Sequence, residues 1–334
     1  MLLRKSHLPR IKILSKSDEK IEFILSETNT AVANSLRRIL LAEVPTLAIE
    51  DVEIEENSTA LFDELIVHRL GFIPLKCDLS TLGTFKFPNQ CDCEEGQDVC
   101  TKCRVVFTLD VGLSATSRSK LSVTSSDLKS SNLKVEPITF ISQDERNMAK
   151  EQGILICKIG PGQRLKLRCV AKKGIGKVHA KWQPVATAVF QHEPSVELNR
   201  VRLSQLNEEQ KTKLVKCCPT KVFTMDKTTQ QVKVEPGDHL KCVMCDECLL
   251  FSDSVKTVQS DAPVVEIGRV PQRFYFTVET TGALKPEDIV LSGIRVLQQK
   301  LREVSEVLEK LPIKRPDEDD SDTDDDDEYE NMGF

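Results

Sequence analysis

The sequence predicts an α+β fold with two main domains, and three patterns support this prediction. Segments near both ends of the chain combine β-like runs with an amphipathic helix. The middle of the chain is a series of β-like runs, and two segments are rich in cysteine. With 334 residues, the chain is long enough for two ordinary domains, or for one core with a large insertion.

The first segment predicts a β-hairpin followed by a helix. Residues 10–14 (RIKIL) and 21–25 (IEFIL) are short β-like runs, and the polar link between them suits a turn. Thr28 or Asn29 can cap the start of the helix. The helix ends before Pro45, because the residue that precedes a proline avoids the α-conformation. The expected apolar face consists of Val32, Leu36, Ile39 and Leu40.

The stretch HRLGFIP predicts the end of a second helix, expected from about residue 59 to residue 70. Gly71 is placed to end this helix, and Pro74 prevents its continuation, so the chain leaves as a strand. His68 has no nucleophile near it in sequence, which favours a structural role for this histidine over a catalytic one.

From about residue 104 the pattern is mostly β-like. The runs RVVFTLDV, KLSVTS, ILICKI and RLKLRCV predict strands, and the Ser-, Lys- and Asp-rich residues 113–152 predict loops. Residues 171–184 predict a basic loop, which is either solvated or in contact with a partner or polyanion. Its lysines are Lys172, Lys173, Lys177 and Lys181.

The last segment predicts a strand and a long helix. Phe274, Phe276 and Val278 alternate onto one face of the strand. Pro286 suits the first turn of the helix. Along the helix, apolar residues recur at alternating spacings of four and three, which is a coiled-coil-like stripe. The stripe consists of Val290, Ile294, Leu297, Leu301, Val304 and Leu308.

The composition favours a globular protein with an acidic tail and no catalytic set. Charged residues make up 29% of the chain, and no apolar run of membrane-spanning length or secretory signal is apparent. Residues 317–334 contain eleven acids and no Lys or Arg, so residues 313–334 are expected to be disordered. The motifs GxxxxGK[ST], GxSxG and HExxH are absent, so no active site is displayed.

Four cysteines within thirteen residues predict a zinc site. The pattern Cys-x-Cys-x6-Cys-x2-Cys supplies the four soft ligands that tetrahedral zinc prefers. Disulfides are disfavoured because no secretory signal is expected. All four positions are filled, so such zinc holds a loop in shape and leaves no position for a catalytic water. The ligands are Cys91, Cys93, Cys100 and Cys103, and unliganded cysteines are the alternative.

A second cysteine group predicts a further metal site. Three of its members have the Cys-x2-Cys-x2-Cys spacing of ferredoxin-type iron–sulfur sites, and the fourth ligand of such sites can come from a distant Cys-Pro pair. A predicted hairpin at residues 222–235 brings the two parts together. A [4Fe-4S] cluster, zinc and no metal are all open here. The group consists of Cys218, Cys242, Cys245 and Cys248.

Several motifs resemble, in the same order, those of the α-like subunit family of archaeal and eukaryotic RNA polymerases. They are NTAVANSLRRILLAEVPTLAIEDVEIEENSTALFDELIVHRLGFIPL, HAKWQPVATAVF and FYFTVETTGALKPEDIVLSGIRVLQQKL. The zinc cysteines resemble the RNA polymerase II branch, whereas HAKWQPVATA and EIGRVPQRF resemble the branch shared by polymerases I and III. A ferredoxin-like redox protein that uses the second cysteine group is a third hypothesis.

The resemblance implies a layout of domains. A dimerisation domain is expected from residues 1–48, 179–204 and 259–312, with an inserted β-rich zinc domain at 49–178. A ferredoxin-like insertion, similar to that of the archaeal counterpart, is expected at 205–258.

The resemblance also implies a role and partners. Members of the family pair with a smaller α-like subunit through helices, and the pair then assembles with the second-largest subunit and a small zinc-bearing subunit. A nuclear, non-catalytic assembly subunit is therefore expected, which meets DNA only through the complex. Arg37 and Arg38 resemble paired arginines near the large-subunit contact, and a solvated helix face is the alternative.

Overall fold

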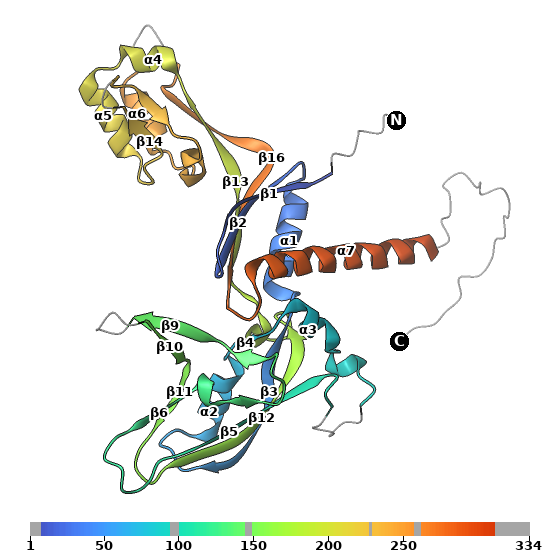
Figure 1. Cartoon of the computed structure of the whole chain (residues 1–334). Coiled ribbons are helices and arrows are strands. Elements are labelled where there is room, and N and C mark those ends of the chain that lie inside the picture. Colours follow the sequence, from blue (N-terminus) through green and yellow to red (C-terminus); the bar gives the residue numbers. More distant parts are fainter. Residues whose placement is uncertain (1–7, 94–99, 144–148, 227–228, 257–261, 311–334) are drawn as a thin grey trace, which may run out of the picture.

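The computed structural model describes residues 8–93, 100–143, 149–226, 229–256 and 262–310. Figure 1 shows two sheet-based parts joined to each other, a small third part carried on a long two-stranded arm, and one projecting helix. The mixed α+β class is confirmed. The acidic residues 313–334 lie outside the described residues. Within the described ranges, no helix is both long and apolar enough to cross a membrane.

The first part is an antiparallel sheet of four strands in the order β1-β2-β16-β13. Two of its strands come from the start of the chain and two from its second half, and helices α1 and α7 pack on it and on each other. We call it the dimerisation sheet, after the domain that the family resemblance predicts for these residues. The elements are β1 (Arg10–Lys16), β2 (Lys20–Ser26), β13 (Val185–Leu198), β16 (Val265–Thr280), α1 (Thr30–Ala42) and α7 (Pro286–Lys310).

Aromatic residues form the core between this sheet and its helices. The predicted alternation of the last strand is confirmed, since Phe274, Phe276 and Val278 are buried. The rings of Phe23 and Phe276 are stacked, with their centroids 5.0 Å apart, and Phe190 meets Phe274 edge-on. Aromatic pairs in such geometries stabilise a core beyond their buried area.

Helix α1 begins at the expected cap, because the Asn29 side chain accepts a hydrogen bond from the Val32 N–H at 3.0 Å. Val32 itself is exposed, so its assignment to the apolar face is wrong. Ala33 takes that place, since it is the residue that stands one turn before Leu36 on the same face. Gly293 lets α7 approach α1 closely, because a Cβ atom at this position would lie 2.7 Å from Leu40 Cδ2.

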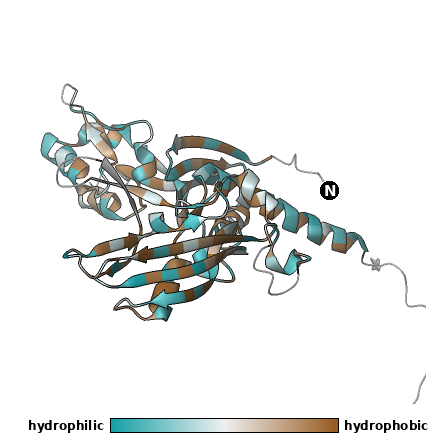
Figure 2. Cartoon of the chain, turned by 60° about the horizontal axis from the view of Figure 1, so that its bottom comes forward, coloured by the Kyte–Doolittle hydropathy of each residue, from teal (hydrophilic) through white to brown (hydrophobic). Residues whose placement is uncertain are grey.

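The second part, which we call the inserted domain, contains a four-stranded sheet in the order β3-β12-β5-β7. Its apolar residues belong to the same continuous core as those of the dimerisation sheet. Two short helices and three further strand pairs complete it, and Figure 2 shows hydrophobic and hydrophilic residues alternating along its strands. The main strands are β3 (Pro45–Asn57), β5 (Arg104–Gly112), β7 (Lys129–Ser130) and β12 (Arg164–Ile175), and the helices are α2 (Asp63–Gly71) and α3 (Leu79–Thr84).

Two expectations for the inserted domain need correction. The helix expected from residue 59 begins only at Asp63, because the side chains of Asn57 and Thr59 bond to the backbone of Leu61 and hold a turn. The runs KLSVTS and ILICKI form the predicted strands β6 and β11, which pair with each other. The loops expected at 113–152 also contain β8, which pairs with a distant strand, and most of the local hairpin of β9 and β10. The pairs are β4 (Leu75–Lys76) with β8 (Glu136–Pro137), β6 (Leu121–Thr124) with β11 (Leu155–Ile159), and β9 (Thr139–Gln143) with β10 (Ala149–Gly153).

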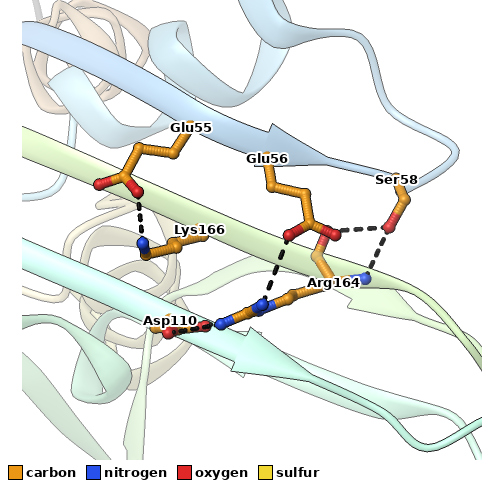
Figure 3. A network of polar contacts seen from close by, with 6 residues as sticks. All are labelled: Glu55, Glu56, Ser58, Asp110, Arg164 and Lys166. Carbon is orange, nitrogen blue, oxygen red and sulfur yellow. Dashed lines mark hydrogen bonds and ion pairs between the residues drawn. The ribbon is translucent and has the colours of Figure 1, made fainter.

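The basic loop expected at 171–184 is wrong for its first residues, because β12 continues to Ile175. Two of its four lysines, Lys172 and Lys181, pair with acids on the outer face of β3, which disfavours contact of these two with a polyanion. They belong to a ladder of ion pairs that follows β3. Figure 3 shows one end of this ladder, where Arg164 lies between Glu56 and Asp110. The pairs are Glu50–Lys181, Asp51–Lys172, Glu53–Arg168, Glu55–Lys166 and Glu56–Arg164.

The third part has a small hydrophobic core of its own. The arm that carries it consists of the distal stretches of β13 and β16, where residues 194–198 pair with residues 265–269. The predicted hairpin is confirmed, since β14 and β15 pair antiparallel. Arg202 is buried at its base, where Nη2 donates to Val255 O and Nε to Ala262 O. Its likeness to ferredoxin stays a prediction. The elements are α4 (Arg200–Gln205), α5 (Glu208–Cys217), β14 (Phe223–Met225), β15 (Val232–Val234), the 3-10 turn η4 (Asp238–Lys241) and α6 (Glu247–Ser254).

Candidate metal centres and dimerisation face

The four cysteines of the first group meet beside the start of β5. Their Sγ atoms all lie within 4.8 Å of one another. The Sγ atoms of Cys91 and Cys100 are 3.7 Å apart, and those of Cys93 and Cys103 are 3.6 Å apart. A tetrahedral ion with Zn–S bonds of about 2.3 Å separates its sulfurs by about 3.8 Å. The spacing of the sulfurs therefore fits one thiolate-bound ion.

Backbone hydrogen bonds close the base of this loop. Lys86 N donates to Lys102 O at 2.9 Å, and Arg104 N donates to Cys100 O at 3.0 Å as the chain enters β5. A backbone hydrogen bond from Lys102 lowers the pKa of the Cys100 thiol to about 7, whereas burial raises the pKa of Cys103. A metal must therefore displace protons from the more buried thiols, which makes its affinity pH-dependent.

Lys173 holds the entrance of the loop, and sequence reasoning missed this role. Its Nζ donates to Leu82 O at 3.1 Å and to Phe85 O at 2.9 Å, and lies 5.1 Å from the centroid of the Phe87 ring. Burial lowers the pKa of Lys173. No sequence pattern marks this residue, because its acceptors are backbone carbonyls 91 and 88 positions away, in and just after α3.

The four cysteines of the second group line one pocket in the third part. They come from the turn after α5, the turn after η4 and the first turn of α6. Val196 and Ile267 from the arm and Phe223 from β14 form apolar walls. Among the described residues, only the first group brings its ligand atoms close enough together for a single ion. A four-iron cluster is larger than one ion, so a wider arrangement of thiols suits it better.

Backbone N–H groups point at two sulfurs of the second group. Val222 N lies 3.4 Å from Cys218 Sγ, and Met244 N lies 3.4 Å from Cys242 Sγ. Burial raises the pKa of Cys218, but hydrogen bonds from backbone N–H groups, Val222 foremost, outweigh it and leave that pKa lowered. Burial raises the pKa of Cys248 to about 12. Donors aimed at sulfur stabilise thiolate, which is the form that binds metal.

The predicted apolar stripe of α7 divides into two halves. The first half contacts the core of the chain, with Val290 buried and Ile294 and Leu297 packed against it. The second half projects, as Figure 1 shows, and Figure 2 shows hydrophobic residues continuing along it. No described residue covers this second half. Its members Leu301, Val304 and Leu308 are 62%, 57% and 57% exposed.

The two arginines of α1 differ in their surroundings. Arg37 is half-buried, and its Nε and Nη2 donate to Asn34 Oδ1 at 3.1 and 2.9 Å, whereas Arg38 is exposed. A contact of these arginines with a large subunit stays a prediction.

Comparison with known proteins decides the family. Residues 22–301 match the sequence profile of the RNA polymerase Rpb3/Rpb11 dimerisation domain. The chain belongs to this family. The match begins within β2 and ends in α7, so it includes β13, β16 and most of β2 of the dimerisation sheet but not β1. The resemblance noted in the motifs is thus confirmed.

Relatives in this family cover nearly the whole chain. It is 42% identical over 298 residues to DNA-directed RNA polymerase II subunit rpb3 of Dictyostelium discoideum, across 89% of this chain and 93% of the relative. It is 41% identical to subunit 3 of RNA polymerases II, IV and V of Arabidopsis thaliana, across 88% and 89%. Identity to RNA polymerases I and III subunit rpac1 of Dictyostelium discoideum is 32%, across 90% and 82%.

Proposed function

We propose that the chain is the third-largest subunit of DNA-directed RNA polymerase II, a non-catalytic subunit that organises assembly of the enzyme for mRNA transcription. The observation that carries the proposal is the exposed apolar half of α7 in a chain of the dimerisation-domain family. The smaller α-like subunit is the expected occupant of that face. The pair then assembles with the second-largest subunit and a small zinc-bearing subunit in the nucleus.

The energetics are compatible with a permanent pairing. Burial of a leucine or valine contributes about 1.5–3 kcal/mol as an upper estimate. Leu301, Val304 and Leu308 together therefore supply several kcal/mol to an interface, before the cost of association is subtracted. The proximal half of α7 is already fixed on α1 and the sheet, so little ordering of the helix itself is needed.

A subunit shared by RNA polymerases I and III is the second candidate, favoured by the motifs HAKWQPVATA and EIGRVPQRF. The identity of 42% to a polymerase II subunit against 32% to a polymerase I and III subunit of the same organism favours polymerase II. A structural role explains the second cysteine group as well as a redox role does. The group therefore gives no particular support to a redox protein.

Purification of the tagged full-length chain from its own cells tests this function. We expect it to co-purify with the two largest subunits of RNA polymerase II and a smaller α-like subunit. The largest subunits of polymerases I and III in their place would move the assignment to the shared subunit. A chain recovered without any polymerase subunit would contradict both assignments.

For the first cysteine group we propose a structural zinc ion held by Cys91, Cys93, Cys100 and Cys103. The sulfur spacings near 3.7 Å support it. With four thiolate ligands, zinc supplies cross-linking of the loop rather than activation of a water. The closed base at Lys86 and Lys102 keeps the loop ends together and so favours this ligand set.

For the second group we propose a [4Fe-4S] cluster held by Cys218, Cys242, Cys245 and Cys248. Support comes from the ligand spacing, the shared pocket with apolar walls, and the N–H groups directed at two sulfurs. Such walls limit access of water to a cluster and so help to set its stability.

We expect anaerobically purified chain to be brown and to lose its visible absorption and its iron when Cys245 is replaced with Ser. The matched control is Cys217→Ser, because Cys217 neighbours this group but does not line the pocket. Colourless wild-type protein, or full iron content in Cys245→Ser, would refute the cluster. Zinc in its place would leave the ligand set intact and correct only the metal.

A further inference from the structure

The arm that carries the third part is interrupted at Glu193. Strand β13 pairs with β16 in two stretches, and the register breaks between His192, which faces Phe274, and Pro194, which faces Arg269. Glu193 thus stands opposite residues 270–273, which have no partner in β13, although Arg273 at their end pairs with Ser26 of β2. Within them, Gln272 has a left-handed φ of 58°. A break of this kind bends a strand pair and removes local ladder bonds, so it is a natural hinge.

A buried carboxylate occupies this break. The Glu193 side chain is only 6% exposed. Its Oε1 lies 3.3 Å from His239 Nε2, and its Oε2 lies 2.8 Å from Arg273 Nε. The contact with Arg273 is a charge pair that is not aligned as a hydrogen bond. A buried carboxylate is retained only where nearby groups offset its loss of hydration, so these partners matter for its placement.

The two partners of Glu193 lie on different sides of the hinge. Arg273 belongs to β16, next to the stretch that forms the dimerisation sheet, whereas His239 belongs to η4 in the third part. Beside this contact, Gln191 Nε2 donates to Leu240 O at 2.9 Å. Gln191 and Glu193 are two residues apart on β13, so both meet the same turn of the third part.

We propose that Glu193 restrains this hinge. Its contacts with His239 and Arg273 set the angle between the cysteine-rich third part and the dimerisation sheet. Within the hinge the ladder bonds are interrupted, so the side-chain contacts take over the restraint. The inference depends neither on a metal in the pocket nor on the identity of the partner subunit.

Pulsed electron paramagnetic resonance on the full-length chain tests whether Glu193 restrains the hinge. Spin labels are attached through non-natural amino acids at two exposed positions, Lys12 in β1 and Lys213 in α5. Wild-type chain is expected to give one narrow distance distribution. Glu193→Gln keeps the shape of the side chain but removes its charge, and is expected to raise the population of other arm angles by about tenfold from a minor fraction.

Two further variants make the outcome decisive. His239→Gln removes only the partner on the third part and is expected to broaden the distribution less than Glu193→Gln. It lies on a partly exposed turn, so it answers the question even if the buried substitution prevents folding. Glu197→Gln, an exposed charge on the same strand, is the control and leaves the distribution narrow. Unchanged distributions in both Glu193→Gln and His239→Gln would overturn the proposal, as would equal broadening in Glu197→Gln.

Discussion

Replacement of both Leu301 and Val304 with aspartate is expected to abolish pairing with the smaller α-like subunit. Both side chains are more than half exposed, so the fold of the chain itself loses little. In the proposed complex each substitution removes about 1.5–3 kcal/mol of apolar burial and forces a carboxylate into an apolar interface. Since about 1.4 kcal/mol is a tenfold change in affinity, the dissociation constant rises at least about 100-fold.

The measurement is co-purification of the two subunits, followed by titration of the purified partners. The control is the pair Gln299→Asp and Arg302→Asp, which adds the same two aspartates to the opposite face of the exposed end of α7. The control should pair normally. Normal pairing of Leu301→Asp with Val304→Asp would show that this face of α7 does not meet the partner.

Replacement of both Cys100 and Cys103 with Ser is expected to release about one zinc ion per chain, since two of four ligands disappear. Structural zinc sites of this type bind with about 10 kcal/mol or more in small domains, and the loss here falls on the loop between Lys86 and Arg104. The loop should then become sensitive to proteases, while the two main sheets, which have their own core, persist.

Elemental analysis and limited proteolysis check this result. The control is Cys217→Ser, which lies outside both ligand sets and keeps a group able to donate to Leu214 O. It should retain all of its zinc and a protected loop. Zinc content that is the same in the double variant and in wild-type chain would refute the assignment of the first cysteine group.

Local signals predicted much of the fold. The cap at Asn29 and the alternation of Phe274, Phe276 and Val278 depend on neighbouring residues, and the structure confirms them. The run KLSVTS predicted β6, whereas the two-residue strands β7 and β8 could not be predicted, because their distant partners β5 and β4 create them. Lys172 and Lys181 look like part of a solvated loop until β3 brings its acids opposite them.

The candidate sites also divide into features that the sequence predicts and features that depend on distant partners. Cysteine spacing marks both candidate metal groups, because most of the ligands of each group lie close together along the chain. Lys173 and Glu193 escape such reasoning, since their partners lie on other elements. The stripe of α7 is visible as a period, but the point at which it leaves its own core, between Leu297 and Leu301, depends on where the packing of α1 and the sheet ends.

The central claim is that the exposed half of α7 exists to meet a second subunit. A photo-crosslinking amino acid at position 301, introduced into the full-length chain in its own cells, tests this most directly. We expect crosslinks to a smaller α-like polymerase subunit, identified by mass spectrometry, and none to that subunit from position 299. Crosslinks from position 301 that stay within this chain, or that reach no polymerase subunit, would contradict the claim.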